Sequence, residues 1–193
     1  LRNGSDISEL LGVTTDGTTG WAFVRPSGAT SSLLAISLES PATTETYAAG
    51  GTVATTIGVL ANGDVVAQRA DGTALCVFDV SAGTWGTPLT GTGLAFGGDG
   101  LDAGDFVYRQ TVAAQQDLSM WDASAGAPVV VSDAAGDDQF QARTADGTVL
   151  FTRVVAGNSN ADLFVWDGTT ATRLTAADAA GLLHDYTVLG SYS

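Results

Sequence analysis

The sequence predicts an all-β fold made of four copies of a repeat about 43 residues long. Three observations predict it: apolar strands recur at a regular spacing, 25 glycines and many threonines divide the chain into short pieces, and Asn-Gly or Asp-Gly pairs precede several strands. Glycine permits the positive φ of tight turns, and threonine suits strands. Because apolar clusters recur along the whole length, the composition is not that of a disordered chain.

Two apolar strands define the repeat. The first ends in arginine, and successive arginines are 44, 40 and 44 residues apart: Arg25, Arg69, Arg109 and Arg153. The second usually ends in aspartate, and its ends are 42, 43 and 45 residues apart: Ser37, Asp79, Asp122 and Asp167. Two registers that agree on one period indicate true internal repeats.

Two further strands complete each repeat. The turns before the arginine-ended strands are Asp16-Gly17, Asn62-Gly63, Ala103-Gly104 and Asp146-Gly147. A short strand before each turn and an outer strand after the second apolar strand give four antiparallel strands joined by hairpins. We place the repeats at residues 8–48, 52–92, 93–135 and 138–176 of a single domain that covers residues 1–193.

A four-stranded sheet of this length would leave both of its faces in water. Packing successive sheets around an axis covers these faces, which predicts a β-propeller whose blades are the repeats. The repeats then form part or all of a larger ring or assembly. A β-sandwich of irregular hairpins is the alternative, but it would not explain the regular period.

The two ends of the sequence do not fit four blades. Residues 184–193 resemble the first strand of a further blade, and ELLGVT near the N-terminus also matches a first strand. Since a four-blade ring has one place for such a strand, we predict that at least one of them pairs outside its own repeats. Its partner would be another copy of the chain, giving a homo-oligomer, or polypeptide beyond this sequence. We also expect a short helix at 176–183.

The fourth repeat, at residues 141–175, resembles the TolB-type, WD-like propeller repeat. That repeat runs Asp-Gly, an apolar strand, a loop, D-L-apolar-V-x-D, a second loop and R-L-T. The matching residues are Asp146, Gly147, Asp162, Leu163, Val165, Asp167, Arg173, Leu174 and Thr175. The second and third repeats match in part, and the first lacks the aspartate and the closing Leu-Thr. The resemblance implies a fold and no particular function, because one fold serves many functions.

The net charge is −14, and all seven basic residues are arginine. Such a charge repels nucleic acid and anionic membranes, so we expect neither as a partner. No apolar stretch reaches the roughly 20 residues that a membrane span requires.

Two acidic loops are candidates for calcium, which prefers six to eight oxygen ligands. The candidate ligands are Asp99, Asp102 and Asp105 in the first loop and Asp133, Asp137 and Asp138 in the second. Neither loop matches an EF-hand, and solvated turns are the alternative. One cysteine and one histidine disfavour zinc and iron sites, and we find no cofactor motif. Cys76 lies in an apolar run and is expected to be a small buried hydrophobe.

The repeated arginines allow two interpretations: a positive ring at one mouth of the channel, or strand ends that pair with nearby acids or carbonyls. With 21 acidic residues for 7 arginines, pairing is favoured. His184 and Asp185 lie near Ser191 and Ser193, but there is no G-x-S-x-G elbow, and neighbours in sequence rarely form a triad. Aromatic residues on the repeat strands are expected in the core: Trp21, Phe78, Trp121 and Trp166. Trp85, on an outer strand, could be exposed.

These observations predict a non-enzymatic β-propeller scaffold, secreted or periplasmic, for protein–protein interaction or self-assembly. We assign no catalytic residue and no cofactor. The alternative is a propeller hydrolase or lyase that acts on an extracellular substrate such as a glycan, with acids converging at the axis. A buried pair of carboxylates facing the channel would favour the enzyme, whereas threonine and apolar side chains there would favour binding.

Overall fold

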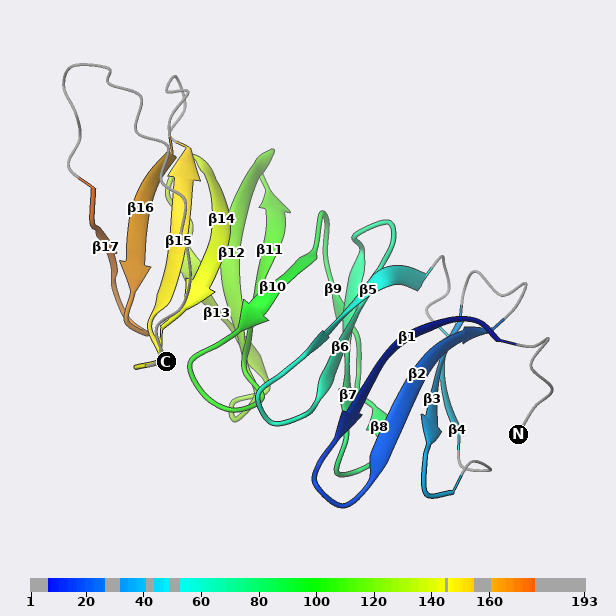
Figure 1. Ribbon diagram of the computed structural model, residues 1–193. Helices are drawn as coiled ribbons and strands as arrows, with labels where there is room; N and C mark the ends of the chain where they lie inside the picture. The colour runs from blue at the N-terminus through cyan, green and yellow to red at the C-terminus, as the bar shows by residue number, and fades with distance from the viewer. Residues whose placement is uncertain are drawn as a thin grey trace. The chain divides into compact units, whose positions relative to one another are not determined.

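The structure is a computed structural model that describes residues 7–26, 32–40, 44–48, 53–144, 146–154 and 161–175. These residues form β-strands, turns and loops, and they include no apolar helix of membrane-spanning length. The strands make four antiparallel sheets, one for each predicted repeat (Figure 1). The prediction of an all-β, propeller-type fold with four-stranded blades is confirmed.

The chain divides into two compact units, Leu1–Leu94 and Ala95–Ser193, each with two sheets. In the first unit, sheet 1 has the order β1 (Ile7–Thr15), β2 (Gly20–Pro26), β3 (Ser32–Ser37) and β4 (Thr44–Ala48). Sheet 2 contains β5 (Val53–Val59), β6 (Val65–Arg69), β7 (Ala74–Asp79), β8 (Thr84–Trp85) and β9 (Leu89–Thr90). Both β8 and β9 pair with β7, so the outer strand of this repeat is split. Pro88 lies in the gap, where it cannot donate a ladder hydrogen bond.

Aromatic side chains from both sheets form the core of the first unit. Phe78 meets Trp21, Phe23 and Trp85 edge-on, at ring-centroid distances of 4.9, 5.2 and 5.0 Å. These contacts make Trp85 half-buried, whereas its place on an outer strand had allowed exposure. Cys76 is buried in the same cluster, as predicted, and its thiol donates to a backbone carbonyl at 3.1 Å.

The second unit repeats this arrangement. Sheet 3 has the order β10 (Ala95–Asp99), β11 (Phe106–Val112), β12 (Gln115–Asp122) and β13 (Ala127–Ser132). Sheet 4 has the order β14 (Asp137–Arg143), β15 (Val149–Val154), β16 (Ala161–Trp166) and β17 (Ala171–Arg173). The short strand predicted before the Ala103-Gly104 turn is therefore β10, although its sequence, AFGGD, contains two glycines.

The core of the second unit joins sheets 3 and 4. Its fully or almost fully buried members are Val107, Leu118, Met120, Val131, Val149, Phe151 and Trp166. The sequence also predicts burial of Leu163 and Val165, but both are half-buried. Successive side chains on a strand point to opposite faces, and Phe164 between them packs on the core, although it is itself half-buried. Trp121 is likewise half-buried.

The predicted turn glycines all have positive φ, close to 90°: Gly17, Gly63, Gly104 and Gly147. A different turn, between β11 and β12, was not anticipated. Ala113 and Ala114 take φ of 49° and 69° there. A left-handed conformation costs an L-residue about 1–2 kcal/mol, so this hairpin is strained.

The predictions for the chain ends are tested only in part. ELLGVT lies within β1, which pairs with β2 of its own sheet. The segments at 176–183 and 184–193 lie outside the described residues. Pairing of a terminal strand outside its own repeats, and a single domain over the whole chain, therefore stay predictions.

Candidate functional site

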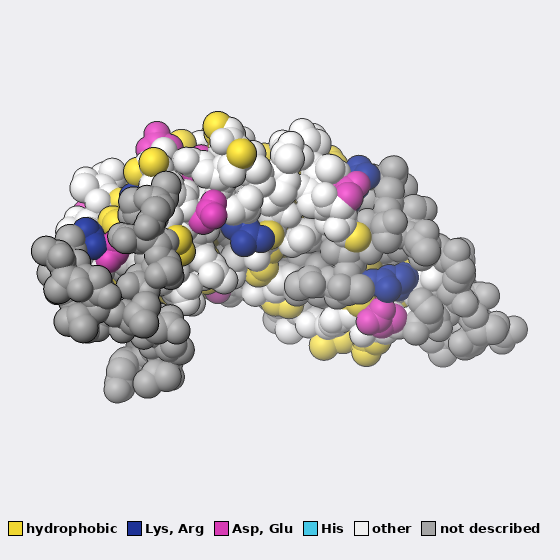
Figure 2. All heavy atoms as spheres, turned by 90° about the horizontal axis from the view of Figure 1, so that it is seen from above, with side chains coloured by type: hydrophobic (Ala, Val, Ile, Leu, Met, Phe, Trp, Pro, Cys, Tyr) yellow, Lys and Arg dark blue, Asp and Glu magenta, His cyan; other side chains and the backbone are white. Residues whose placement is uncertain are grey.

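The repeated arginine lies on the second strand of each sheet, at or next to the strand end in sheets 1, 2 and 4. In sheet 3 the prediction that this strand ends in arginine is wrong, because β11 continues beyond Arg109 to Val112 through its pairing with β12. Cross-strand pairing sets an acid opposite the repeated arginine in two sheets: Arg25 faces Glu9, and Arg153 faces Asp138. The N···O distances of these ion pairs are 2.9 and 2.8 Å. On the face shown in Figure 2, arginine side chains (blue) lie beside acidic ones (magenta). The pairing interpretation of the repeated arginines thus describes these two sheets.

The other two sheets lack an acid at this register position. Arg69 is paired with Val53, and its guanidinium instead contacts Asp71 of the following hairpin at 2.6 Å. Arg109 is paired with Ala95 and has no such substitute. It is the one arginine in the described part of the chain with neither an ion pair nor a hydrogen bond. Its Nε atom is buried without an acceptor, a property that it shares with the Nε atoms of Arg25, Arg69 and Arg143.

Arg109 borders a cavity of about 240 Å³ between sheets 3 and 4. Its guanidinium and the Gln139 amide are the polar side chains of the lining. Phe96, Leu118 and Phe140 supply the apolar side chains. A cation beside aromatic and aliphatic walls is suited to an anion that carries an apolar group.

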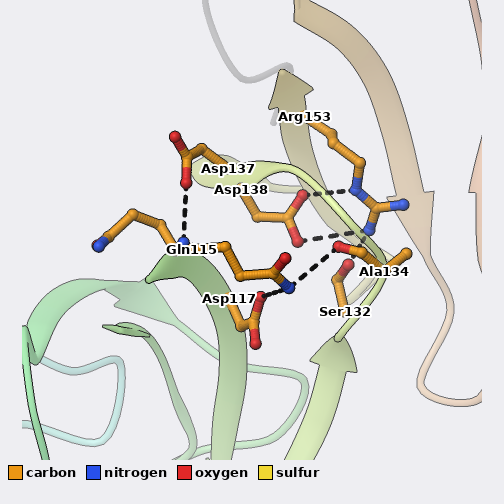
Figure 3. Close-up of polar contacts among 8 residues, drawn as sticks. Gln115, Asp117, Ser132, Ala134, Asp137, Asp138 and Arg153 are labelled. Carbon is orange, nitrogen blue, oxygen red and sulfur yellow. Dashed lines mark hydrogen bonds and ion pairs between the residues drawn. The ribbon is translucent and has the colours of Figure 1, made fainter. Parts of the chain in front are cut away.

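Arg153 lies in a buried polar cluster (Figure 3). The cluster includes Asp138, which precedes the cavity-lining residue Gln139. The Nε of Arg153 donates to Asp138 at 2.8 Å, and a terminal nitrogen donates to the Ser132 hydroxyl. The guanidinium carbon also lies 4.6 Å from the ring centroid of Phe164, a cation–π contact. The cluster therefore joins the end of β13 to the start of β14 and the end of β15.

Asp117 is the second buried carboxylate of this cluster, and it accepts a hydrogen bond from the Gln115 amide at 2.6 Å. Burial raises the pKa of Asp138, and the nearby Asp117 charge adds to this effect. Hydrogen bonds from Ser132 and Arg153 lower it without cancelling the cost of burial. The free-energy cost of desolvating a paired carboxylate can exceed the gain from its partner, so burial of the Arg153–Asp138 ion pair carries such a cost.

In the first calcium candidate loop, one of the three acids, Asp105, has a structural role. Asp105 is buried, and its two oxygens accept the backbone N–H groups of Ala123 and Asp102 at 2.9 and 3.1 Å. Asp102 itself is exposed, and Asp99 is half-buried at the end of β10.

In the second loop, Asp138 serves Arg153, and Asp137 accepts the backbone N–H of Gln116 at 2.9 Å. Asp133 is exposed. Within the ranges that the structure describes, no three His, Cys, Asp or Glu side chains come together in a way that could hold a metal ion. Calcium binding stays a prediction.

The aspartates that end the third strands stabilise turns. Asp79 accepts hydrogen bonds from the Ala82 N–H and the Ser81 hydroxyl, both of which lower its pKa. Asp122 and Asp167 make equivalent bonds, and these likewise lower the pKa of each carboxyl. The repeated aspartate is therefore a turn cap. His184, Asp185, Ser191 and Ser193, to which the sequence assigns no catalytic role, lie outside the described residues.

No protein-family model and no curated protein matches the sequence. Solved structures are similar in fold. TolB from Agrobacterium tumefaciens matches with a TM-score of 0.53 and 15% identity, over 85% of this chain and 60% of that one. TolB from Acinetobacter baumannii matches with a TM-score of 0.51 and 14% identity, over 86% of this chain and 43% of that one. The fold is that of a TolB-like β-propeller.

A streptogramin B lyase is also similar, with a TM-score of 0.51 and 13% identity, over 92% of this chain and 58% of that one. The chain thus spans about half the length of the propellers it matches. Identities at this level establish the fold alone, and a shared fold carries no function.

Proposed function

We propose that this chain is a non-enzymatic β-propeller scaffold, secreted or periplasmic, that binds a protein partner or further copies of itself. An apolar face on sheet 1 carries the proposal. Leu10 and Val13 of β1 are 61% and 59% exposed. The strand register places them in line with Val24 and Ala22 of β2, of which Val24 is buried, and then with the half-buried Leu34 and Ile36 of β3.

Three properties support a protein as the occupant of this face. Contiguous exposed apolar residues on a folded protein mark interaction sites. In the described part of sheet 1, β1 pairs only with β2, so one of its edges is open to an added strand. The charge of −14 disfavours nucleic acid and anionic membranes as alternatives.

The acidic composition also supports a place outside the cytoplasm, which fractionation of the producing cells would test.

Sedimentation velocity over a range of concentrations tests association. The variant Leu10→Asp/Val13→Asp should dissociate any oligomer, because charges on an apolar face oppose its burial. The matched control is Val130→Asp, a residue 58% exposed on β13, which should sediment like the wild type. If the wild type and both variants sediment alike as monomers, self-association is excluded. If a partner protein binds the wild type and Leu10→Asp/Val13→Asp with equal affinity, this face is excluded as its binding site.

A hydrolase or lyase that acts on an extracellular substrate such as a glycan is the second candidate. The observation in its favour is the presence of two buried carboxylates, Asp117 and Asp138, which are 5% and 1% exposed. The similarity to a streptogramin B lyase makes the fold compatible with such chemistry. Any turnover found in a substrate screen should be lost in both Asp117→Asn and Asp138→Asn. Turnover that persists in both variants would exclude this carboxylate pair as the active site.

A further inference from the structure

Arg109 is the exception among the repeated arginines. The chain holds 21 acidic residues for 7 arginines, so the lack of a counter-charge beside Arg109 does not reflect a shortage of acids. Where sheets 1 and 4 have an acid opposite the arginine, sheet 3 has Ala95. A guanidinium without a counter-charge keeps its capacity to bind an anion, and an acid at position 95 would have neutralised it as Glu9 and Asp138 neutralise Arg25 and Arg153.

Small residues on β10 both remove the counter-charge and open the cavity. Ala95 and Gly97 line it, where larger side chains would fill the space. Phe140 packs so closely over β10 that a Cβ atom at Gly98 would lie 2.6 Å from its ring, and one at Gly97 3.0 Å from its Cβ. The position of this aromatic wall therefore depends on the two glycines. The small residues of β10 and the close packing of Phe140 therefore shape the cavity between sheets 3 and 4.

We propose that the Arg109 cavity binds a small organic carboxylate, with the carboxylate on the guanidinium and the apolar part of the ligand against Phe96 and Phe140. Guanidinium and carboxylate match in geometry and charge. Phosphate is a poorer candidate, because phosphate sites gather several donors or a helix N-terminus, and here a single arginine stands among apolar walls.

The size of the cavity limits the ligand. Its volume of about 240 Å³ exceeds that of cavities that hold one benzene molecule, which are near 150 Å³, and lies below the roughly 300 Å³ at which sites for drug-sized ligands begin. An acid with one ring or a branched aliphatic group fits this range. Such a site would add a small-molecule ligand to the protein–protein role proposed above, and neither depends on the other.

Phenylacetate is a suitable probe, and phenylacetamide is its neutral counterpart of nearly the same shape. Isothermal titration of the full chain should show saturable binding of phenylacetate that is about ten- to a hundredfold tighter than that of the amide, as charge-assisted hydrogen bonds produce. Equal affinities for the two compounds, or no saturable binding of phenylacetate, would overturn the proposal.

Variants assign the binding to Arg109. Arg109→Gln should lose the preference for the acid, and because Arg109 has no partner in the described structure, the fold should persist. Ala95→Glu should abolish binding by supplying the counter-charge found in sheet 1. Arg173→Gln is the matched control, since this arginine of the same unit is already paired with Asp162 at 2.5 Å. Binding that survives both Arg109→Gln and Ala95→Glu would place the ligand elsewhere. A peptide ending in phenylalanine that binds more than tenfold tighter than phenylacetate would refute a small free acid as the ligand.

Discussion

The cost of removing one acid from an equivalent ion pair should depend on burial, and two repeats of this chain provide the comparison. Asp138 and Glu9 occupy the same register position opposite the repeated arginine. The side chains of Arg153 and Asp138 are 9% and 0% exposed, whereas those of Arg25 and Glu9 are 20% and 47% exposed. The pairs differ in their access to solvent, and Arg153 also donates to Ser132 and packs on the ring of Phe164.

Asp138→Ala should destabilise the protein by about 3–5 kcal/mol, because it leaves the Arg153 charge buried without its partner. Glu9→Ala should cost about 0–1 kcal/mol, the usual contribution of an exposed ion pair. Urea denaturation followed by tryptophan fluorescence reports both changes, since Trp21 lies in the core of the first unit and Trp166 in that of the second. Equal costs for the two substitutions would refute the argument from burial.

The pH dependence gives an independent check. Since burial raises the pKa of Asp138 in the folded state, the folded chain binds this proton more tightly than the unfolded chain does. The contribution of Asp138 to stability should therefore increase as the pH falls through its folded-state pKa towards the unfolded value near 3.9. Asp79 and the other turn aspartates have lowered pKa values and act in the opposite sense, so the measured quantity is the stability difference between wild type and Asp138→Asn. A difference that does not vary between about pH 4 and 7 would refute the raised pKa.

Three other predictions test the fold and the acidic loops. Phe151→Ala should cost about 3–5 kcal/mol, whereas Leu163→Ala on the half-buried face should cost about 1–2 kcal/mol, both measured by urea denaturation; equal costs would contradict the assignment of faces. Ala113→Asn/Ala114→Gly should raise stability by roughly 0.5–1.5 kcal/mol, because both new residues tolerate positive φ, and a loss of stability would contradict the strained turn. Calcium bound to either acidic loop should raise the melting temperature by mass action, and an identical melting temperature in chelator and in calcium would dismiss both loops.

The strands of this fold could be predicted from the sequence because the repeat shows each of them four times. A strand that is weak in one copy, such as the glycine-rich β10, is placed by its equivalents in the others. The turns followed from local chemistry, since the glycine of each predicted pair takes the positive φ that only glycine adopts freely. Turn chemistry is a property of short segments, and the period can be counted directly along the chain, so both can be interpreted without the fold.

Burial was harder to predict because it depends on which face of a sheet receives a neighbour. Leu163 and Phe164 are adjacent and both apolar, and the sequence does not show which of them faces sheet 3. The Ala113–Ala114 turn was missed for a related reason. Alanine has no preference for positive φ, so the hairpin is imposed by the pairing of β11 with β12 and leaves no signal in composition.

The Arg109 cavity shows where in a repeat protein such a site can arise. In the sequence the four repeated arginines are equivalent members of one period, and each lies on the second strand of its sheet. What differs is the residue across the pair, which depends on register: Glu9, Val53, Ala95 or Asp138. Irregularities in the pairing shift that register in every blade, so the partner cannot be counted off from the arginine in the sequence. A repeat keeps the features that every blade needs. A binding site can therefore form where one blade has the arginine but lacks the acid that neutralises it in sheets 1 and 4.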